Sequence, residues 1–283
     1  MATAVPAPID RAPRDIAGWA ARFDVATLPV LGATAAEIAL LRENEDAVDA
    51  HLLTETVAAD PLLTLKLLSH VARLRRSRGD DTRGDPETVT AALVMLGIGP
   101  FFRAFGDVGT VEDALASRPE ALEGFNAVLQ RSRRAANFAL GFAVHRMDHD
   151  APVIHEAALL HDFAELLLWL RAPSLALEIA RRQADDATLR SAAVQRELLH
   201  IELPDLQHEL MLAWRLPPLL VRISDDRHCD TPQVRNVLLA IRVARHSAKG
   251  WDNAALPDDV AEIADLLQLG IDPTWRLLNE LDT

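Results

Sequence analysis

Hydrophobic residues recur every three or four positions along most of the chain, which is the spacing of one face of an α-helix. After Pro61, for example, Leu63, Leu67, Val71 and Leu74 follow this spacing. The sequence has no runs of alternating β-branched residues and no Asn-Gly or Asp-Gly hairpin turns, while Ala, Leu, Glu and Arg dominate. The pattern predicts an all-α fold in which this leucine-rich face is core.

Residues that favour helix ends indicate where several helices begin. Thr34 and Glu37 have the spacing of a capping box, in which each side chain bonds to the backbone amide of the other residue. Asp60-Pro61 and Asp85-Pro86 each place an N-cap residue before a proline, which is favoured at the first helical position. We therefore expect helices to begin at these three places.

The segment 75–85 (RRSRGDDTRGD) contains no apolar residue, so it predicts an exposed loop between two helices. The helix after this loop is expected from Pro86 to about Leu96, because Gly97 is suited to the residue that ends a helix. A basic stretch begins just before this loop and comprises Arg73, Arg75, Arg76, Arg78 and Arg83. Aspartates of the loop balance most of its charge, and no aromatic residues alternate with the arginines for base stacking. A solvated loop is therefore a better interpretation than a nucleic-acid site.

Two longer segments complete the predicted core. Beyond Pro119 the apolar spacing predicts a long amphipathic helix that ends in the polar stretch 145–150 (HRMDHD). The segment 157–170 (AALLHDFAELLLWL) is apolar on nearly every side, which predicts one central helix packed all round. Further helices are expected around 174–184, 188–200, 205–215, 233–249, 258–269 and 274–281.

His161 and Asp162 interrupt the apolar segment, with Glu165 one turn later. A carboxylate in an apolar helix is costly unless it is paired or binds a cation. A metal site would need three or more further ligands from other helices, because adjacent residues on a helix diverge by about 100°. The alternative is a capped or salt-bridged pair that stabilises the core. The residues alone leave both interpretations open.

A denser polar cluster comprises His145, Asp148, His149 and Asp150. Its two histidines have the i, i+4 spacing of a zinc-binding helix, but the glutamate of an HExxH motif is missing. Because the cluster lies at a predicted helix end, just before a proline, a solvated helix terminus is the simpler interpretation.

The composition of the chain excludes several classes of partner and site. Lys and Arg number 29 and Asp and Glu 42, giving a net charge of −13, which disfavours nucleic acid and anionic membranes as partners. Cys229 is the only cysteine, so intramolecular disulfides and thiolate metal clusters are excluded. The N-terminal residues have no secretory pattern, and no uncharged run reaches the length of a membrane span. We therefore expect a cytoplasmic protein.

Several segments, taken together and in order, resemble the HDOD family. The N-terminal ones are 28–44 (LPVLGATAAEIALLREN), 58–71 (AADPLLTLKLLSHV) and 87–98 (ETVTAALVMLGI). They are followed by 158–168 (ALLHDFAELLL), which resembles the family's His-Asp helix, and by 213–220 (AWRLPPLL), which resembles its Trp-x-Leu-Pro motif. The resemblance covers roughly residues 25 to 250. HDOD domains are related to the HD-type metal phosphohydrolases, are implicated in bacterial signalling and are commonly regarded as non-catalytic.

The resemblance implies a multi-helix fold in which an N-terminal helical subdomain packs on an HD-like helical subdomain. The implied boundaries are an N-terminal extension with a short helix at 1–24, the N-terminal subdomain at 25–118, the HD-like subdomain at 119–250 and a C-terminal helical extension at 251–283.

The resemblance also implies where the chain departs from a metal site. The early histidine ligand of HD phosphohydrolases falls at or near Arg131, and the late aspartate near Arg245. Of a later histidine pair only His228 is present, and the glycine and lysine that usually follow the His-Asp pair are Ala164 and Glu165. Arginine is a permanent cation that cannot coordinate a metal. We therefore expect no catalytic residue, no metal and no cofactor.

These departures lead to a structural hypothesis. A guanidinium group, from Arg131 or Arg245, takes the place of the metal's charge and neutralises Asp162. With His161, Glu165 and His228, these residues are the candidates for a vestigial site or a weak anion site.

Two functions follow from the resemblance. The first is a non-enzymatic bacterial signalling protein that acts by binding a partner protein. The alternative is a degenerate phosphohydrolase or a nucleotide or anion sensor, whose pocket around His161, Asp162, Arg131 and His228 binds a small anionic ligand through its arginines.

Overall fold

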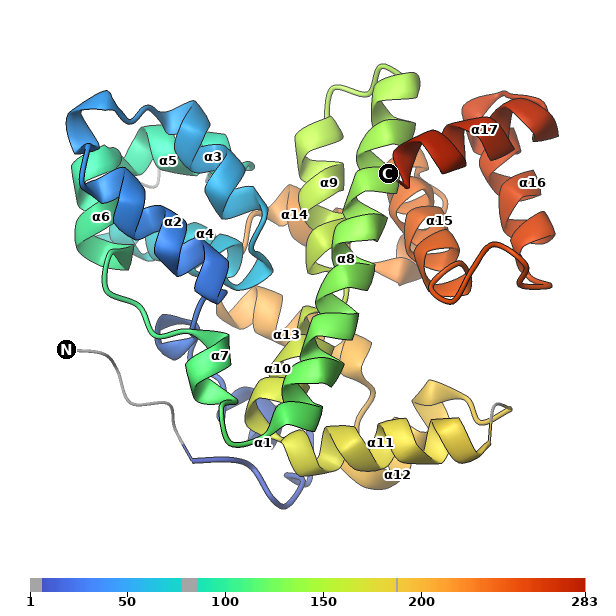
Figure 1. Ribbon diagram of the computed structural model, residues 1–283, viewed down its shortest axis with the longest axis horizontal. Helices are drawn as coiled ribbons and strands as arrows, with labels where there is room; N and C mark the ends of the chain where they lie inside the picture. The colour runs from blue at the N-terminus through green and yellow to red at the C-terminus, as the bar shows by residue number, and fades with distance from the viewer. Residues whose placement is uncertain (1–6, 78–85, 187, 283) are drawn as a thin grey trace. The chain divides into compact units, whose positions relative to one another are not determined.

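The computed structural model describes residues 7–77, 86–186 and 188–282 (Figure 1). Over these ranges the chain forms α-helices, short 3-10 helices and one isolated β-bridge, between Val30 and Thr110. The predicted all-α fold is confirmed. None of the helices in these ranges has the length and apolarity that crossing a membrane requires.

The helices form two compact units, and each unit combines two separate stretches of chain. The first comprises Met1–Ala127 and Asp162–Pro217, and the second comprises Val128–His161 and Pro218–Thr283. The chain therefore passes from the second unit to the first between His161 and Asp162. The subdomain boundaries that the family resemblance implies, at residues 24, 118 and 250, stay a prediction.

In the first unit α4 contacts α3 and α5, and α10 contacts α11 and α13 (Figure 1). Its helices are α1 (Ile16–Ala20), η1 (Val25–Thr27), α2 (Gly32–Arg42), η2 (Glu45–Ala47), α3 (Ala50–Ala58), α4 (Pro61–Ser77), α5 (Val89–Leu96), α6 (Ile98–Phe105), α7 (Val111–Ala114), the first part of α8 (Pro119–His145), α10 (Phe163–Arg171), α11 (Pro173–Asp185), α12 (Ser191–Leu199) and α13 (Leu203–Ala213).

In the second unit α15 contacts α9 and α16, and α16 contacts α17. Its helices are the remainder of α8, α9 (Ala151–Leu160), α14 (Pro218–Ile223), η3 (Asp226–His228), α15 (Pro232–His246), α16 (Leu256–Leu267) and α17 (Ile271–Leu281). The long helix expected after Pro119 is confirmed as α8. All six predicted later helices are present, with ends within three residues, as α11, α12, α13, α15, α16 and α17. The sequence does not predict α14.

Helix α4 is the centre of the N-terminal part of the first unit. Leu63, Leu67 and Val71 are at most 1% exposed, which confirms the predicted core face, and Leu74 is half-buried. The helix continues to Ser77, so the loop predicted to begin at residue 75 begins too early. The absence of apolar residues after Leu74 does not mark the end of α4, because the last turn of a helix can consist of polar residues.

The N-terminus of α2 is stabilised by side chains from elsewhere in the chain. The amide of Leu31 donates to the carboxylate of Asp60 at 2.8 Å, and that of Gly32 donates to Glu112 at 2.8 Å. The helix begins at Gly32, so the capping box predicted at Thr34 is wrong. Carboxylates distant in sequence satisfy these amides, and the local capping residues do not.

Asp60 itself caps α4, as the sequence predicts, and accepts from the amides of Leu62 and Leu63 at 2.9 and 3.1 Å. The next predicted start is wrong by three residues, since α5 begins at Val89 and Thr88 is its N-cap. Asp85, the residue predicted to cap it, lies outside the described residues.

The end of α5 is placed correctly by the sequence. Gly97 follows its last residue with φ at 84°, a left-handed conformation that glycine adopts without the steric cost of a side chain. The glycine therefore ends α5 and allows α6 to begin at Ile98.

We predict that Asp60→Ala destabilises the protein by about 2 to 4 kcal/mol, because it leaves buried amides unpaired at two helix starts. Asp60→Asn keeps one acceptor oxygen and should cost less. Urea unfolding followed by circular dichroism measures both, and equal stability of Asp60→Ala and the wild type would show that these amides find other partners.

Candidate functional site

The His161-Asp162 pair lies at a break between two helices. Helix α9 ends at Leu160 and α10 begins at Phe163, so the single central helix predicted over 157–170 is wrong. The backbone of Asp162 has φ at −108° and ψ at 20°, which is not helical. The apolar residues of segment 157–170 correctly predict that it is buried, but a buried segment need not form one continuous helix.

His161 pairs with a carboxylate of its own unit. Its side chain is 8% exposed, and Nε2 lies 3.1 Å from an oxygen of Asp226 in η3. This contact is of the salt-bridged kind that the sequence left open for the pair, although the partner was not among the candidates. Only the charged run Asp225-Asp226-Arg227 could have drawn attention to Asp226 in the sequence.

The other residues predicted for a vestigial site are distributed over both units. Asp162, which is 7% exposed, and Glu165 belong to the first unit. Arg131 in α8, Arg245 in the last turn of α15 and His228 at the end of η3 belong to the second. Neutralisation of Asp162 by an arginine stays a prediction. Among the described residues, no group of three or more His, Cys, Asp or Glu side chains is placed to hold a metal.

The histidines at 145 and 149 do not share a helical face. Helix α8 ends at His145, and Met147 adopts a left-handed backbone with φ at 54°. The chain therefore turns between the two histidines, and the i, i+4 geometry of a zinc helix does not form.

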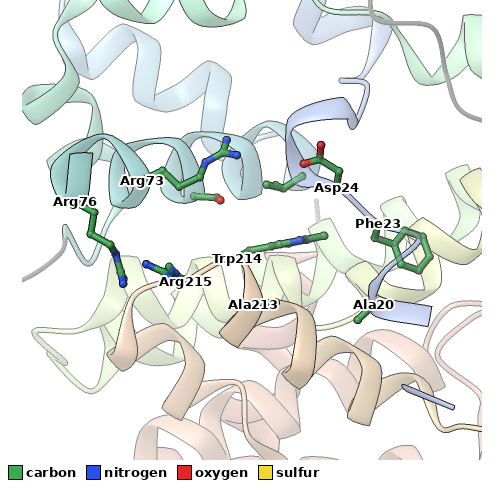
Figure 2. Close-up of a pocket in the computed structure, with 10 residues that line it drawn as sticks. Ala20, Phe23, Asp24, Arg73, Arg76, Ala213, Trp214 and Arg215 are labelled. Atoms are coloured by element: carbon green, nitrogen blue, oxygen red, sulfur yellow. The ribbon is translucent and has the colours of Figure 1, made fainter. Parts of the chain in front are cut away.

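The first unit contains a pocket that the sequence did not predict, with a volume of about 590 Å³. Figure 2 shows Trp214 edge-on beneath Arg73, with Arg76 and Arg215 toward one end and Asp24 and Phe23 toward the other. The walls come from α1 and η1, from α4 and from the end of α13, and are formed by Ala20, Phe23, Asp24, Val25, Ser69, Arg73, Arg76, Ala213, Trp214 and Arg215.

One polar face of α4 provides a wall of this pocket. Ser69, Arg73 and Arg76 follow each other at steps of four and three residues, so they lie on the same side of the helix. Lys66 precedes them on this face and is 6% exposed. This spacing was visible in the sequence, but the arginines were grouped with the following loop.

Lys66 attaches the η1 segment to α4. Its Nζ donates to the carbonyl oxygens of Ala26 and Leu28 at 2.8 and 2.6 Å. Burial lowers the pKa of Lys66 to about 8, with the charge of Arg73 acting in the same direction and those of Asp24 and Asp60 opposing it. The lysine thereby holds η1 and its N-cap residue Asp24 in place beside the pocket.

The opposite wall follows the end of α13. Arg215 has φ at 60°, so the backbone turns sharply after Trp214. The ring of Trp214 stacks on Phe163 of α10, with centroids 5.6 Å apart and planes at 30°. This packing fixes the indole, and the left-handed turn presents the next guanidinium to the pocket.

Comparison with protein families matches the HDOD domain over residues 28–229. The chain belongs to the HDOD family. The matched range includes α4, the His161-Asp162 pair and the Trp214 motif, which confirms the resemblance drawn from these segments. Arg245 lies beyond it. No curated protein matches the chain significantly.

Solved structures with the same fold include proteins of Methylococcus capsulatus and Campylobacter jejuni. The MmoQ response regulator of Methylococcus capsulatus strain Bath has a TM-score of 0.67 and 23% identity, over 89% of this chain and 98% of its own. A virulence factor from Campylobacter jejuni has a TM-score of 0.62 and 16% identity, over 90% and 92% of the two chains. At these identities the likeness is one of fold.

In this HDOD protein we predict that Lys66 makes stability rise with pH above 8. Folding lowers its pKa from 10.5 to about 8, so between these values the unfolded chain binds a proton that the folded protein has released. The free energy of unfolding then increases by up to about 1.4 kcal/mol per pH unit. Below pH 8 the full penalty for burying the charge remains.

The matched control is Lys66→Met, which lacks the titrating group. Urea unfolding of both proteins at pH 8, 9 and 10 gives the stability difference directly. The sequence favours the measurement because it has no tyrosine and only one other lysine, Lys249. A difference that stays constant over this range would contradict the predicted titration.

Proposed function

We propose that this HDOD protein is a regulatory module that acts by binding a partner protein and does not hydrolyse phosphoesters. The observation that carries the proposal is the contact of His161 with Asp226 at 3.1 Å. The imidazole of the family's His-Asp pair is 8% exposed and engaged by a carboxylate of its own unit. It serves as a structural hydrogen-bond partner in this arrangement.

The residues at the implied ligand positions support the same proposal. The family resemblance implies a histidine at or near Arg131 and an aspartate near Arg245. A guanidinium group has no lone pair for a metal at physiological pH and repels the cation. A site with two such substitutions holds a divalent metal poorly. The names of similar structures, which include a response regulator, agree with a regulatory role.

Hydrolysis of bis-p-nitrophenyl phosphate in the presence of Mn, Fe, Zn or Mg tests the catalytic part. We expect the wild type and Asp162→Asn to give the same rate, equal to that of the metal alone. Turnover by the wild type that Asp162→Asn abolishes would contradict the proposal. Retention of stoichiometric metal after extensive dialysis would do so as well.

Three exposed apolar side chains lie at and just beyond the end of α8, in the second unit. Leu140 and Val144 are 37% and 62% exposed one turn apart on α8, and Met147 just beyond the helix is 84% exposed. Exposed apolar side chains that lie together mark interaction sites more often than isolated ones do. We infer that a protein partner packs an apolar surface against these three residues.

Val144→Glu tests this surface, because a charge in an apolar interface is costly to desolvate. A partner recovered with the wild type is purified, and its affinity for each variant is measured by calorimetry. We expect Val144→Glu to weaken binding by roughly tenfold or more. Val94→Glu, at a residue 68% exposed on α5, is the matched control. Equal affinities for the two variants would contradict the proposed surface.

A further inference from the structure

The pocket of the first unit has the size of a small-molecule site. Its volume of about 590 Å³ lies within the usual range for ligand pockets, about 300 to 1,000 Å³. Apolar and aromatic side chains, among them Phe23, Val25 and Trp214, line it together with a few polar groups. The apolar side chains can bury the apolar part of a ligand, and the charged groups can fix its orientation.

Positive charge is concentrated at this pocket in a protein whose net charge is −13. Arg73, Arg76 and Arg215 line it, are exposed, and have no ion-pair partner among the described residues. The charge of Arg73 lowers the pKa of Lys66 and of His70, in both cases after the larger effect of burial. Several arginines elsewhere in the chain, such as Arg181 and Arg182, lie in ion pairs. The pocket arginines are therefore available to an anion.

Ser69 adds a polar group to the same wall. It is 1% exposed, and its Oγ has no hydrogen-bond partner within the described part of the chain. A buried hydroxyl without a partner costs about 1 to 3 kcal/mol, which a ligand atom at the wall can recover. The hydroxyl lies on the α4 face that also carries Arg73 and Arg76.

The two ends of the pocket have opposite charge. Asp24 lies at the end away from Arg76 and Arg215 (Figure 2). One of its oxygens accepts from the amide of Ala26 at 2.9 Å, and the carboxylate accepts further donors. An extended acidic peptide would bring negative charge against this carboxylate. A ligand with an anionic group at one end and hydrogen-bond donors at the other is complementary to the arginine end and to the Asp24 end of the pocket.

We propose that this pocket binds a mononucleotide. The phosphate lies among the guanidinium groups of Arg73, Arg76 and Arg215. The base lies against Trp214, with the donors on its edge directed at Asp24. Guanine presents a ring N–H and an amino group side by side, which suits a carboxylate, whereas adenine presents one donor beside an acceptor. The site is distinct from the residues around His161, where an anion was expected from the sequence.

Calorimetric titration of the full chain at low ionic strength, with GMP, AMP and inorganic phosphate as probes, tests the proposal. We expect GMP to bind most tightly and phosphate most weakly. Arg73→Gln and Arg215→Gln should each weaken GMP binding by about tenfold or more, because each removes a charge-assisted hydrogen bond. Arg103→Gln, at an exposed arginine of the same unit outside the pocket, should leave it unchanged.

Asp24→Asn tests the end of the site that binds the base separately from the end that binds the phosphate. The amide oxygen can still cap η1, but it accepts one donor of the base less strongly and no longer repels the phosphate. We expect the preference for GMP over AMP to fall by about tenfold and inorganic phosphate to bind more tightly. Melting curves by circular dichroism confirm that each variant is folded at the temperature of the titration.

Three outcomes would overturn the proposal. The first is no heat of binding with any probe up to millimolar concentration, and the second is an equal loss in Arg103→Gln. The third is binding of hexaglutamate as tightly as GMP with the same sensitivity to Arg73→Gln, which would identify an acidic protein segment as the occupant. The readout uses purified protein alone, so it is independent of the partner and of the catalytic assay.

Discussion

The buried carboxylate of Asp60 fixes the starts of two helices in the first unit. It is fully buried and accepts from the amide of Leu31 before α2 and from the amides of Leu62 and Leu63 in α4. Burial raises the pKa of Asp60, and these amides oppose the shift by stabilising the charged form. A buried carboxylate without such donors costs several kcal/mol, so the start of α2 is held beside the start of α4 by the need to satisfy one group.

The polar face of α4 extends this constraint to the pocket. Lys66 lies less than two turns beyond Asp60 and attaches the η1 segment through the carbonyls of Ala26 and Leu28. One turn further, Ser69 and then Arg73 line the pocket. The same helix therefore positions the core on its leucine face and the pocket on its polar face. A change at Asp60 that shifts α4 along its axis moves both.

Local patterns in the sequence predicted local structure well and missed what depends on distant residues. Leucine spacing located α4 and α8, since helix periodicity is set by residues a few positions apart. The start of α2 was misplaced because its amides bond to Asp60 and Glu112, from other segments. The break at His161 was hidden because residues on both sides are buried. In each error the deciding contact or packing is tertiary.

The pocket was missed for a related reason. Arg73 and Arg76 were grouped with the charged residues after Ser77, although their spacing from Ser69 indicates one face of α4. Arg215 appeared only as the variable residue of a Trp-x-Leu-Pro motif, and its left-handed backbone has no sequence signal of its own. Asp24 reaches the same pocket from a segment about fifty residues earlier than Arg73. No local pattern brings these three side chains together.

Net charge and local charge lead to different conclusions about partners. At physiological ionic strength, interactions between exposed charges fall off over about 8 Å, so distant carboxylates act weakly on a group inside the pocket. Guanidinium groups that line the pocket act at contact distance. The net charge of −13 therefore weighs against a polyanion, which would extend over the acidic surface. It weighs little against an anion small enough to be enclosed, which is why composition excluded one class of ligand and left the other open.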